Sequence, residues 1–220
     1  MYRRKLLSVL AFSLLSQVSF SAAAATQGED YVVLDTPLPE SQNTFVKVFS
    51  YDCPFCFKYD KSVDPVLLPR IEKETGLTFK PMHLETKGKY GRAASEFLAM
   101  CMLRDKEKGV SIEAKDSLFK KAKDAIYYAY HRKNERWTDG EDAFIKTMSD
   151  ATGIDQDTFA KERVSEPVKA LADSWKVSYP VAKIQGIPAY VVNGKYLIMT
   201  KSIRSIDGLV ELVKELKDMK

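Results

Sequence analysis

Residues 45–56 read FVKVFSYDCPFC, an apolar stretch that ends in a Cys-X-X-Cys pair. The apolar, β-branched part predicts a strand, and the pair predicts the first turn of a helix. With Cys53 at the N-cap, Pro54 takes the first helical position, where its missing N–H costs nothing. The N–H groups of Phe55 and Cys56 then have no intrahelical acceptor and point toward the Cys53 sulfur. Those donors and the helix dipole favour a thiolate, so we expect a lower pKa at Cys53 than at Cys56.

The order strand, Cys-X-X-Cys, helix is typical of a thioredoxin-like redox site, and we favour this interpretation. A zinc site would need about four nitrogen or sulfur ligands. Beyond the pair, the chain offers only Cys101, His83 and His131. A purely structural disulfide is the other alternative, but so short a ring removes little entropy from the unfolded chain. We therefore expect Cys53 and Cys56 to be catalytic and no residue to bind metal, with Cys101 and His83 in structural roles.

The N-terminus has the composition of a secretory signal peptide, which we place at residues 1–25. A basic start at 3–5 precedes an apolar segment at 6–20, and small residues supply a cleavage site near Ala25. A membrane anchor is the alternative, but it needs about 20 apolar residues. Gln17 and several serines interrupt this segment. The mature protein is therefore expected to be exported to an oxidising compartment, where disulfides persist.

Charge gives no support to a nucleic-acid partner. The chain has 34 basic and 30 acidic side chains, and loss of the three basic residues in 1–25 leaves 31 against 30. No basic block dominates, as a nucleic-acid footprint requires. Two segments, 80–92 and 183–204, are nonetheless rich in basic residues. We expect a positive rim on the active-site side, with scattered solvated lysines as the alternative. The candidates for this rim are Lys87, Lys89, Arg92, Lys183 and Lys195.

Strand and helix patterns alternate along the chain. Strands are expected at 31–34, 44–51 and 77–84. The helix that follows the Cys pair is expected to break at Asp64-Pro65 and to end at Gly76.

The second half of the chain is helical and then returns to strand. Between Gly88 and Tyr179 the apolar residues have helical spacing. Asn193-Gly194 separates two β-rich runs and predicts a type I′ hairpin, before a last helix at 205–217. The pattern predicts an α/β, thioredoxin-like fold with an inserted all-helical domain. We place the thioredoxin-like domain at 26–87 and 180–220, and the helical insertion at 88–179.

Three motifs carry a resemblance that covers essentially the whole mature chain. The first lies around the Cys pair and consists of Phe49-Ser50-Tyr51 before it and Lys58-Tyr59-Asp60-Lys61 after it. The second is His83-Leu84-Glu85-Thr86-Lys87-Gly88, and the third is segment 183–196, which contains Gly-Ile-Pro and Asn-Gly. In these motifs the chain resembles the DsbA-like thiol:disulfide oxidoreductases of bacterial periplasms, and among them the DsbL branch. Cys-X-X-Cys alone is moderately specific, whereas its combination with the other motifs and a helical insertion is a strong signal.

The resemblance implies a role for each site residue. Cys53 would be the exposed sulfur that a substrate thiol attacks, and Cys56 would be its buried partner. Ile187-Pro188 would be a cis-proline loop that faces the pair and offers main chain to a substrate strand.

Two positions depart from the best-known members of the family. Those members carry His where this chain has Phe55, and an acidic residue where it has Lys47. We expect Pro54, Phe55 and Lys47 to tune the active site, with Lys47 stabilising the Cys53 thiolate if its side chain points inward.

The resemblance also implies a direction of chemistry and a set of partners. The protein would be a periplasmic enzyme that donates the Cys53–Cys56 disulfide, without a cofactor and as a monomer. Its partners would be reduced periplasmic proteins, with an arylsulfate sulfotransferase as a preferred substrate, and a DsbB/DsbI-type quinone-linked membrane protein that reoxidises it. Two alternatives stay open, a disulfide reductase or isomerase and a non-catalytic thioredoxin-like binding module.

Overall fold

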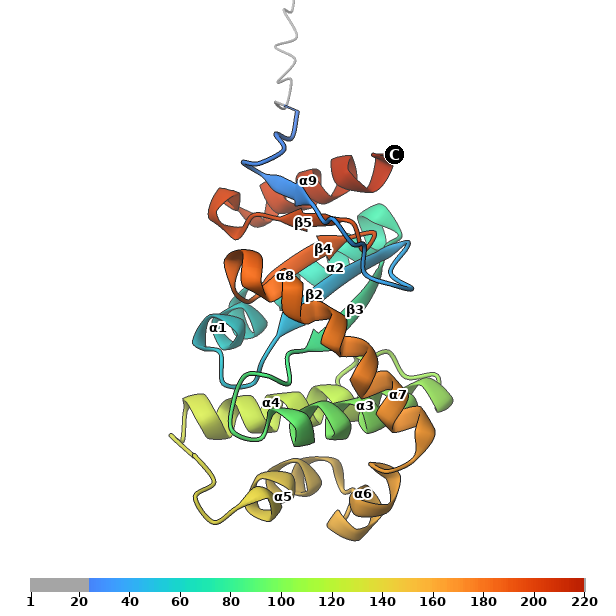
Figure 1. Cartoon of the computed structure of the whole chain (residues 1–220), viewed down its shortest axis with the longest axis vertical. Coiled ribbons are helices and arrows are strands. Elements are labelled where there is room, and N and C mark those ends of the chain that lie inside the picture. Colours follow the sequence, from blue (N-terminus) through green and yellow to red (C-terminus); the bar gives the residue numbers. More distant parts are fainter. Residues whose placement is uncertain (1–23, 220) are drawn as a thin grey trace, which may run out of the picture.

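A five-stranded mixed sheet with its covering helices forms one half of the molecule, and a block of helices forms the other (Figure 1). The computed structural model describes residues 24–219, so residues 1–23 of the expected signal peptide lie outside the described residues. Within 24–219, no helix is both long and apolar enough to cross a membrane.

The sheet has the order β1-β5-β4-β2-β3, in which β2 and β3 are parallel and the other pairs are antiparallel. Its strands are β1 (Tyr31–Val33), β2 (Thr44–Phe49), β3 (Thr78–His83), β4 (Ala189–Val192) and β5 (Tyr196–Ile198). Asn193 and Gly194 both have positive φ, 53° and 66°. A type I′ turn requires this at both central positions, so the predicted hairpin is confirmed.

The helices also follow the predicted breaks. They are α1 (Pro54–Ser62), α2 (Asp64–Thr75), α3 (Gly91–Glu107), α4 (Leu118–His131), α5 (Glu141–Thr152), α6 (Gln156–Glu162), α7 (Glu166–Ser174), α8 (Ser178–Gln185) and α9 (Ile206–Asp218), with 3-10 turns η1 (Trp175–Val177) and η2 (Thr200–Ser202). Helix α1 ends at Ser62, with one residue between it and Asp64-Pro65, and Gly76 closes α2 with φ 72°. A left-handed glycine is the usual end of a helix because it has no Cβ to clash.

Alternation along β2 separates two apolar clusters, one on each face of the sheet. Phe45 packs with residues of α2 and α9, such as Leu67 and Val213. Val46 and Val48 point the other way and pack with the helical block. The Cys pair lies at the end of β2, so it sits where the sheet half meets the helical half (Figure 1).

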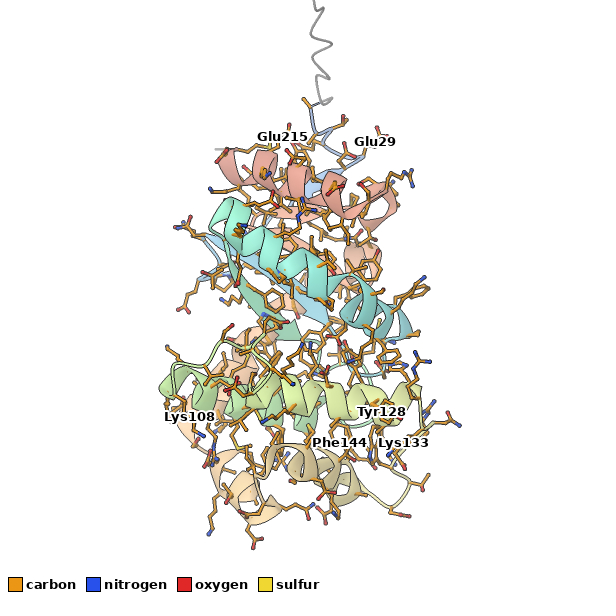
Figure 2. The ribbon with its side chains drawn as sticks, turned by 180° about the vertical axis from the view of Figure 1, so that it is seen from behind. Glu29, Lys108, Tyr128, Lys133, Phe144 and Glu215 are labelled. Atoms are coloured by element: carbon orange, nitrogen blue, oxygen red, sulfur yellow. The ribbon has the colours of Figure 1, made fainter. Side chains whose placement is uncertain are left out.

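Helices α3 to α7 make up the helical block. Figure 2 shows side chains filling the space between α4 and α5, to which Phe144 of α5 contributes, whereas Tyr128 and Lys133 lie near the end of α4. The chain returns to the sheet through η1 and α8. The expected domain boundary at 179/180 falls inside α8, and the division into domains stays a prediction about folding units.

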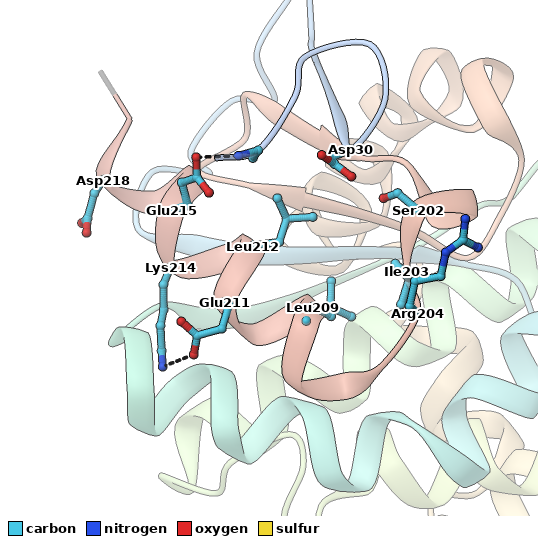
Figure 3. Close-up of a pocket in the computed structure, with 12 residues that line it drawn as sticks. Asp30, Ser202, Ile203, Arg204, Leu209, Glu211, Leu212, Lys214, Glu215 and Asp218 are labelled. Atoms are coloured by element: carbon cyan, nitrogen blue, oxygen red, sulfur yellow. Dashed lines mark hydrogen bonds and ion pairs between the residues drawn. The ribbon is translucent and has the colours of Figure 1, made fainter. Parts of the chain in front are cut away.

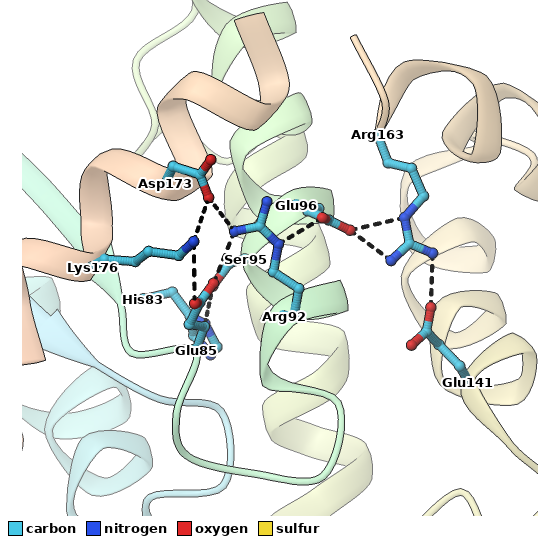
Figure 4. Close-up of polar contacts among 9 residues, drawn as sticks. All are labelled: His83, Glu85, Arg92, Ser95, Glu96, Glu141, Arg163, Asp173 and Lys176. Carbon is cyan, nitrogen blue, oxygen red and sulfur yellow. Dashed lines mark hydrogen bonds and ion pairs between the residues drawn. The ribbon is translucent and has the colours of Figure 1, made fainter. Parts of the chain in front are cut away.

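Ion pairs tie the segment after β3 to the helical block (Figure 4). Arg92 at the start of α3 contacts Glu85 at 2.9 Å and Asp173 of α7 at 2.6 Å. Lys176 completes the link, since it lies 2.8 Å from the same Asp173 carboxylate. The loop that follows Glu85 is thereby anchored at its base.

Candidate active site

Cys53 is the N-cap of α1, as the sequence predicts. Its sulfur accepts a hydrogen bond from the main-chain nitrogen of Cys56 at 3.2 Å, and Pro54 takes the first helical position. Both cysteines are free thiols in the structure. The first turn of α1 contains no acidic residue to oppose a negative sulfur.

The surroundings make the two thiols unequal. A hydrogen bond from the Cys56 thiol is the largest cause that lowers the pKa of Cys53, and it outweighs the effect of burial. The main-chain N–H groups of Cys56 and Phe55 and the charge of Lys87 act in the same direction, and the pKa falls to about 7. Burial does the opposite to Cys56 and raises its pKa far above the ordinary value. Near neutral pH, Cys53 is therefore the thiol that ionises.

The Cys53 side chain is less open than expected. Cys53 is 3% exposed and Cys56 is fully buried, so the prediction of an exposed Cys53 sulfur is wrong in terms of surface area. Cys53 instead lines a groove of about 480 Å³, which we name the Cys53 groove. The other residues that matter in it are Phe55, Thr86, Lys87, Tyr179, Lys183 and Ile187. Phe55 lies at the edge of the groove, and its side chain is 65% exposed. A larger hollow along α9 shares no lining residue with this groove (Figure 3).

The loop before β4 faces the Cys pair. The peptide bond between Ile187 and Pro188 is cis. The carbonyl oxygen of Ile187 lies 3.4 Å from the Cys53 sulfur and accepts a hydrogen bond from its thiol. The sequence had predicted both the cis bond and the position beside the pair.

Lys47 points inward, but it does not serve Cys53 as expected. Its ammonium forms a buried ion pair with Asp64, the first residue of α2. The second carboxylate oxygen of Asp64 accepts a hydrogen bond from the Tyr190 hydroxyl at 2.9 Å. The charge of Lys47 opposes the rise in the pKa of Cys56. Lys47 therefore lies behind the pair and acts on the inner thiol.

A second buried ion pair, Asp60 with Lys123, was missed by the sequence reasoning. It joins α1, which carries the Cys pair, to α4 of the helical block. Burial alone would raise the pKa of Asp60, but Lys123 and Lys47 outweigh it and lower that pKa to about 2. Lys123 lies among buried Phe119, Ile126 and other apolar residues of α4. A lysine inside an apolar helical stripe signals a buried partner, although it does not name one.

The candidates for the positive rim separate into two groups. Lys87 and Lys183 line the Cys53 groove. Arg92 is instead bound by three carboxylates. Lys195 lies in the β4–β5 turn and lines a different hollow, together with Pro37 and its neighbours. Lys89 is not among the residues that line the Cys53 groove, and its ammonium lies 5.0 Å from the centroid of the Tyr90 ring. Two of the five candidates therefore line the groove.

Known proteins resemble this chain over nearly its whole length. The thiol:disulfide interchange protein DsbL of Escherichia coli O6:H1 is 53% identical over 201 residues, which cover 90% of each chain. DsbL of Lelliottia amnigena is 54% identical over 200 residues, 90% of this chain and 89% of the relative. The chain belongs to the DsbL branch of the DsbA-like thiol:disulfide oxidoreductases. No family model matches it.

Solved structures agree with this membership. The crystal structure of DsbL from Salmonella enterica serovar Typhimurium superposes with a TM-score of 0.84 at 52% identity, covering 90% of this chain and all of that one. DsbA of Klebsiella pneumoniae, at 20% identity, shares the fold with a TM-score of 0.66 over 89% and 97% of the two chains. The expected thioredoxin-like fold with a helical insertion is therefore confirmed, and the DsbL-branch chain is a thiol:disulfide oxidoreductase.

Proposed function

We propose that this DsbL-branch protein is a periplasmic dithiol oxidase that donates the Cys53–Cys56 disulfide to reduced proteins. The observation that carries the reactive role of Cys53 in this proposal is the inequality of the two thiols. Cys53 accepts the Cys56 N–H at 3.2 Å beside a groove, whereas Cys56 is fully buried. An incoming thiolate can reach one sulfur of the pair and not the other.

The reaction takes two exchange steps. A substrate thiolate attacks Cys53, the Cys53–Cys56 bond breaks, and Cys56 leaves and takes up a proton, as its raised pKa favours. The second substrate thiolate then attacks the substrate sulfur of the mixed disulfide and Cys53 leaves. A thiol of lowered pKa is the better leaving group, which suits Cys53. The substrate loses two electrons and the pair gains them.

The Cys53 groove supports a role in holding the substrate. The Ile187 carbonyl lies beside the reacting sulfur, where an extended segment can pair with it as an added strand. Phe55 and Tyr179 offer apolar contact, and Lys87 and Lys183 add positive charge. This combination suits an acidic substrate with an apolar residue near its cysteine. We include an arylsulfate sulfotransferase among the substrates on the strength of the family resemblance.

Turnover requires an electron acceptor, and we propose a DsbB/DsbI-type quinone-linked membrane protein. The signal peptide expected at 1–25 supports export to the periplasm, where the oxidase would act as a monomer. We propose catalytic roles for Cys53 and Cys56, substrate binding by Ile187 and Pro188, and tuning by Pro54, Phe55 and Lys47.

A reductase is the alternative that the pKa alone leaves open. Thioredoxin, a reductant, has a cysteine pKa of about 7, and Cys53 has a similar one. The donor direction therefore rests on membership of the DsbL branch.

Alkylation trapping of the Cys pair in cells separates the two directions. A donor is trapped mostly as the disulfide, and a reductase mostly as the dithiol. In vitro, oxidised protein mixed with a reduced, unfolded dithiol protein should pass its disulfide on, and Cys53→Ser should abolish the transfer. Transfer that survives Cys53→Ser would remove the basis of the proposal.

A further inference from the structure

Both histidines of the chain contact the main chain of one residue, Tyr51, which lies two positions before Cys53. His83 Nε2 lies 3.3 Å from the Tyr51 nitrogen. His131 Nε2 lies 2.8 Å from the Tyr51 carbonyl oxygen. The two rings come from different halves of the molecule, because His83 ends β3 and His131 ends α4.

The partners fix the hydrogen on each ring. A carbonyl oxygen only accepts, so His131 carries its hydrogen on Nε2. An N–H only donates, so His83 Nε2 is free of hydrogen, and the hydrogen lies on Nδ1, which is 2.8 Å from the Ser95 hydroxyl (Figure 4). The His83 ring is therefore neutral in this arrangement, and burial lowers the pKa of both histidines.

Ring contacts add to these bonds. His83 stacks on the Tyr51 ring, with centroids 6.0 Å apart and 7° between planes. His131 stacks on Phe57 at 4.8 Å and 12°. It therefore touches the chain both before and after the Cys-X-X-Cys turn. The Tyr51 hydroxyl accepts from the Tyr90 nitrogen at 3.0 Å, and a Cβ at Gly88 would lie only 2.7 Å from the Tyr51 ring. Together these contacts enclose the Tyr51 side chain.

The position of Tyr51 matters because it lies inside the turn that leads into α1. The Cys53 nitrogen donates to the Ser50 carbonyl at 3.2 Å across this turn. A turn fixed at both main-chain groups of Tyr51 holds the N-cap in its extended conformation, φ −81° and ψ 115°. That conformation brings the Cys53 sulfur onto the Cys56 N–H.

We propose that His83 and His131 are positioning residues that clamp the Tyr51 main chain and so keep the donors of the first α1 turn aimed at the Cys53 sulfur. The inference rests on the proposed role of Cys53 as the reactive thiol. It gives the helical insertion a part in the redox chemistry, since His131 belongs to α4 and acts through Tyr51 rather than on either sulfur.

Two variants of His131 separate a clamp from a packing role. His131→Phe keeps a ring against Phe57 and loses the donor to Tyr51, whereas His131→Gln keeps an N–H donor. The measurements are the thiolate titration of Cys53 and the equilibrium constant of the pair with glutathione. A lost hydrogen bond of about 1 kcal/mol corresponds to a change of roughly fivefold. We expect His131→Phe to raise the Cys53 pKa and to shift the equilibrium about fivefold toward the disulfide, and His131→Gln to restore most of both.

A matched control tests whether a general loss of stability, rather than the lost hydrogen bond, changes the Cys53 pKa and the glutathione equilibrium. Phe159→Leu in α6 reduces packing against Phe97, away from Tyr51, and should leave both values unchanged. His83→Gln, which keeps an acceptor for Tyr51, should resemble the wild type. Equal values in His131→Phe and wild type, or an equal shift in Phe159→Leu, would overturn the inference. If Cys53→Ser still abolished transfer in that case, the proposed function would stand without the clamp.

Discussion

The main-chain nitrogen of Cys56 lies 3.2 Å from the Cys53 sulfur and donates a hydrogen bond to it. In the first turn of α1, one cysteine of the pair thus stabilises negative charge on the other. The Cys56 thiol contributes as well, and its hydrogen bond is the largest cause of the lowered Cys53 pKa. The pair therefore forms an asymmetric unit, in which Cys56 stays protonated while Cys53 ionises.

Removal of the Cys56 thiol should weaken that asymmetry. In Cys56→Ala we expect the Cys53 pKa to rise from about 7 toward the ordinary cysteine value of about 8.5. The ultraviolet absorbance of the thiolate, titrated with pH, measures it. Cys101→Ala removes a buried thiol in α3 and should cause no shift. A Cys56→Ala protein with an unchanged titration would show that the Cys56 thiol does not stabilise the Cys53 thiolate.

The two groove lysines should set the preference for acidic substrates. Lys87→Ala and Lys183→Ala are each expected to slow oxidation of an acidic unfolded dithiol protein by at least roughly twofold at low salt. The effect should fade as salt shortens the Debye length to about 8 Å and below. Lys195→Ala makes the same charge change in the β4–β5 turn and serves as the control. Equal slowing by all three variants, or no salt dependence, would argue against a local rim.

The ion pair between Asp60 and Lys123 should hold α1 against α4. Lys123→Met leaves the buried Asp60 carboxylate with the ammonium of Lys61, 3.3 Å away, as its remaining ion-pair partner. The expected cost is up to about 3 kcal/mol in the free energy of unfolding, the lower end of the range for a buried pair that loses one member. In the double variant Asp60→Leu with Lys123→Met, both charges are gone and most of that loss should be recovered. Urea unfolding of the two variants provides the comparison. A double variant no more stable than Lys123→Met would mean that the pair has a role beyond charge compensation.

His83 should make the fold sensitive to acid. Burial lowers its pKa to about 3 from an ordinary value of 6.5, so the unfolded chain binds a proton that the folded one does not. The resulting stability is complete above about pH 6.5 and is lost as the pH falls toward 3, on the order of 5 kcal/mol in all. Asp60 has its own pKa lowered to about 2 and adds a loss only below about pH 4.

Unfolding free energies of wild type and His83→Gln across this range test the assignment. The wild type should lose stability between pH 6.5 and 4, and His83→Gln should lose much less. Burial also lowers the pKa of His131. The variant His131→Gln therefore serves as the control, because it shows how much of the pH dependence comes from that second histidine. Parallel pH profiles for wild type and His83→Gln would contradict the assignment.

Local chemistry explains the parts of the fold that the sequence predicted. The break at Asp64-Pro65, the glycine end of α2 at Gly76 and the Asn193-Gly194 turn each depend on residues a few positions apart. The placement of Cys53 at an N-cap depends on the same short range. Such features can be predicted because backbone preference and capping decide them before tertiary contacts do.

The contacts behind the Cys pair could not be predicted in this way. Asp60 and Lys123 lie 63 positions apart in sequence, and Tyr51 and His131 lie 80 positions apart. Their pairing depends on how α4 packs against the sheet half, and no local pattern records that. The sequence analysis expected Lys47 to stabilise the Cys53 thiolate. It could not show that Lys47 pairs with Asp64, because Asp64 belongs to a different element, α2. The available signal was Lys123, a charged residue within an apolar stripe of α4. This signal predicts that the lysine is buried with a partner, but it does not identify the partner.

Equilibration of the Cys53–Cys56 pair with glutathione tests disulfide donation most directly. The fraction of oxidised protein, measured over a range of reduced to oxidised glutathione, gives the reduction potential of the pair. Donation predicts a value more positive than about −200 mV, toward the DsbA value of about −120 mV. A value more negative than that, near the −270 mV or so of thioredoxin, would contradict donation and make the chain a reductase.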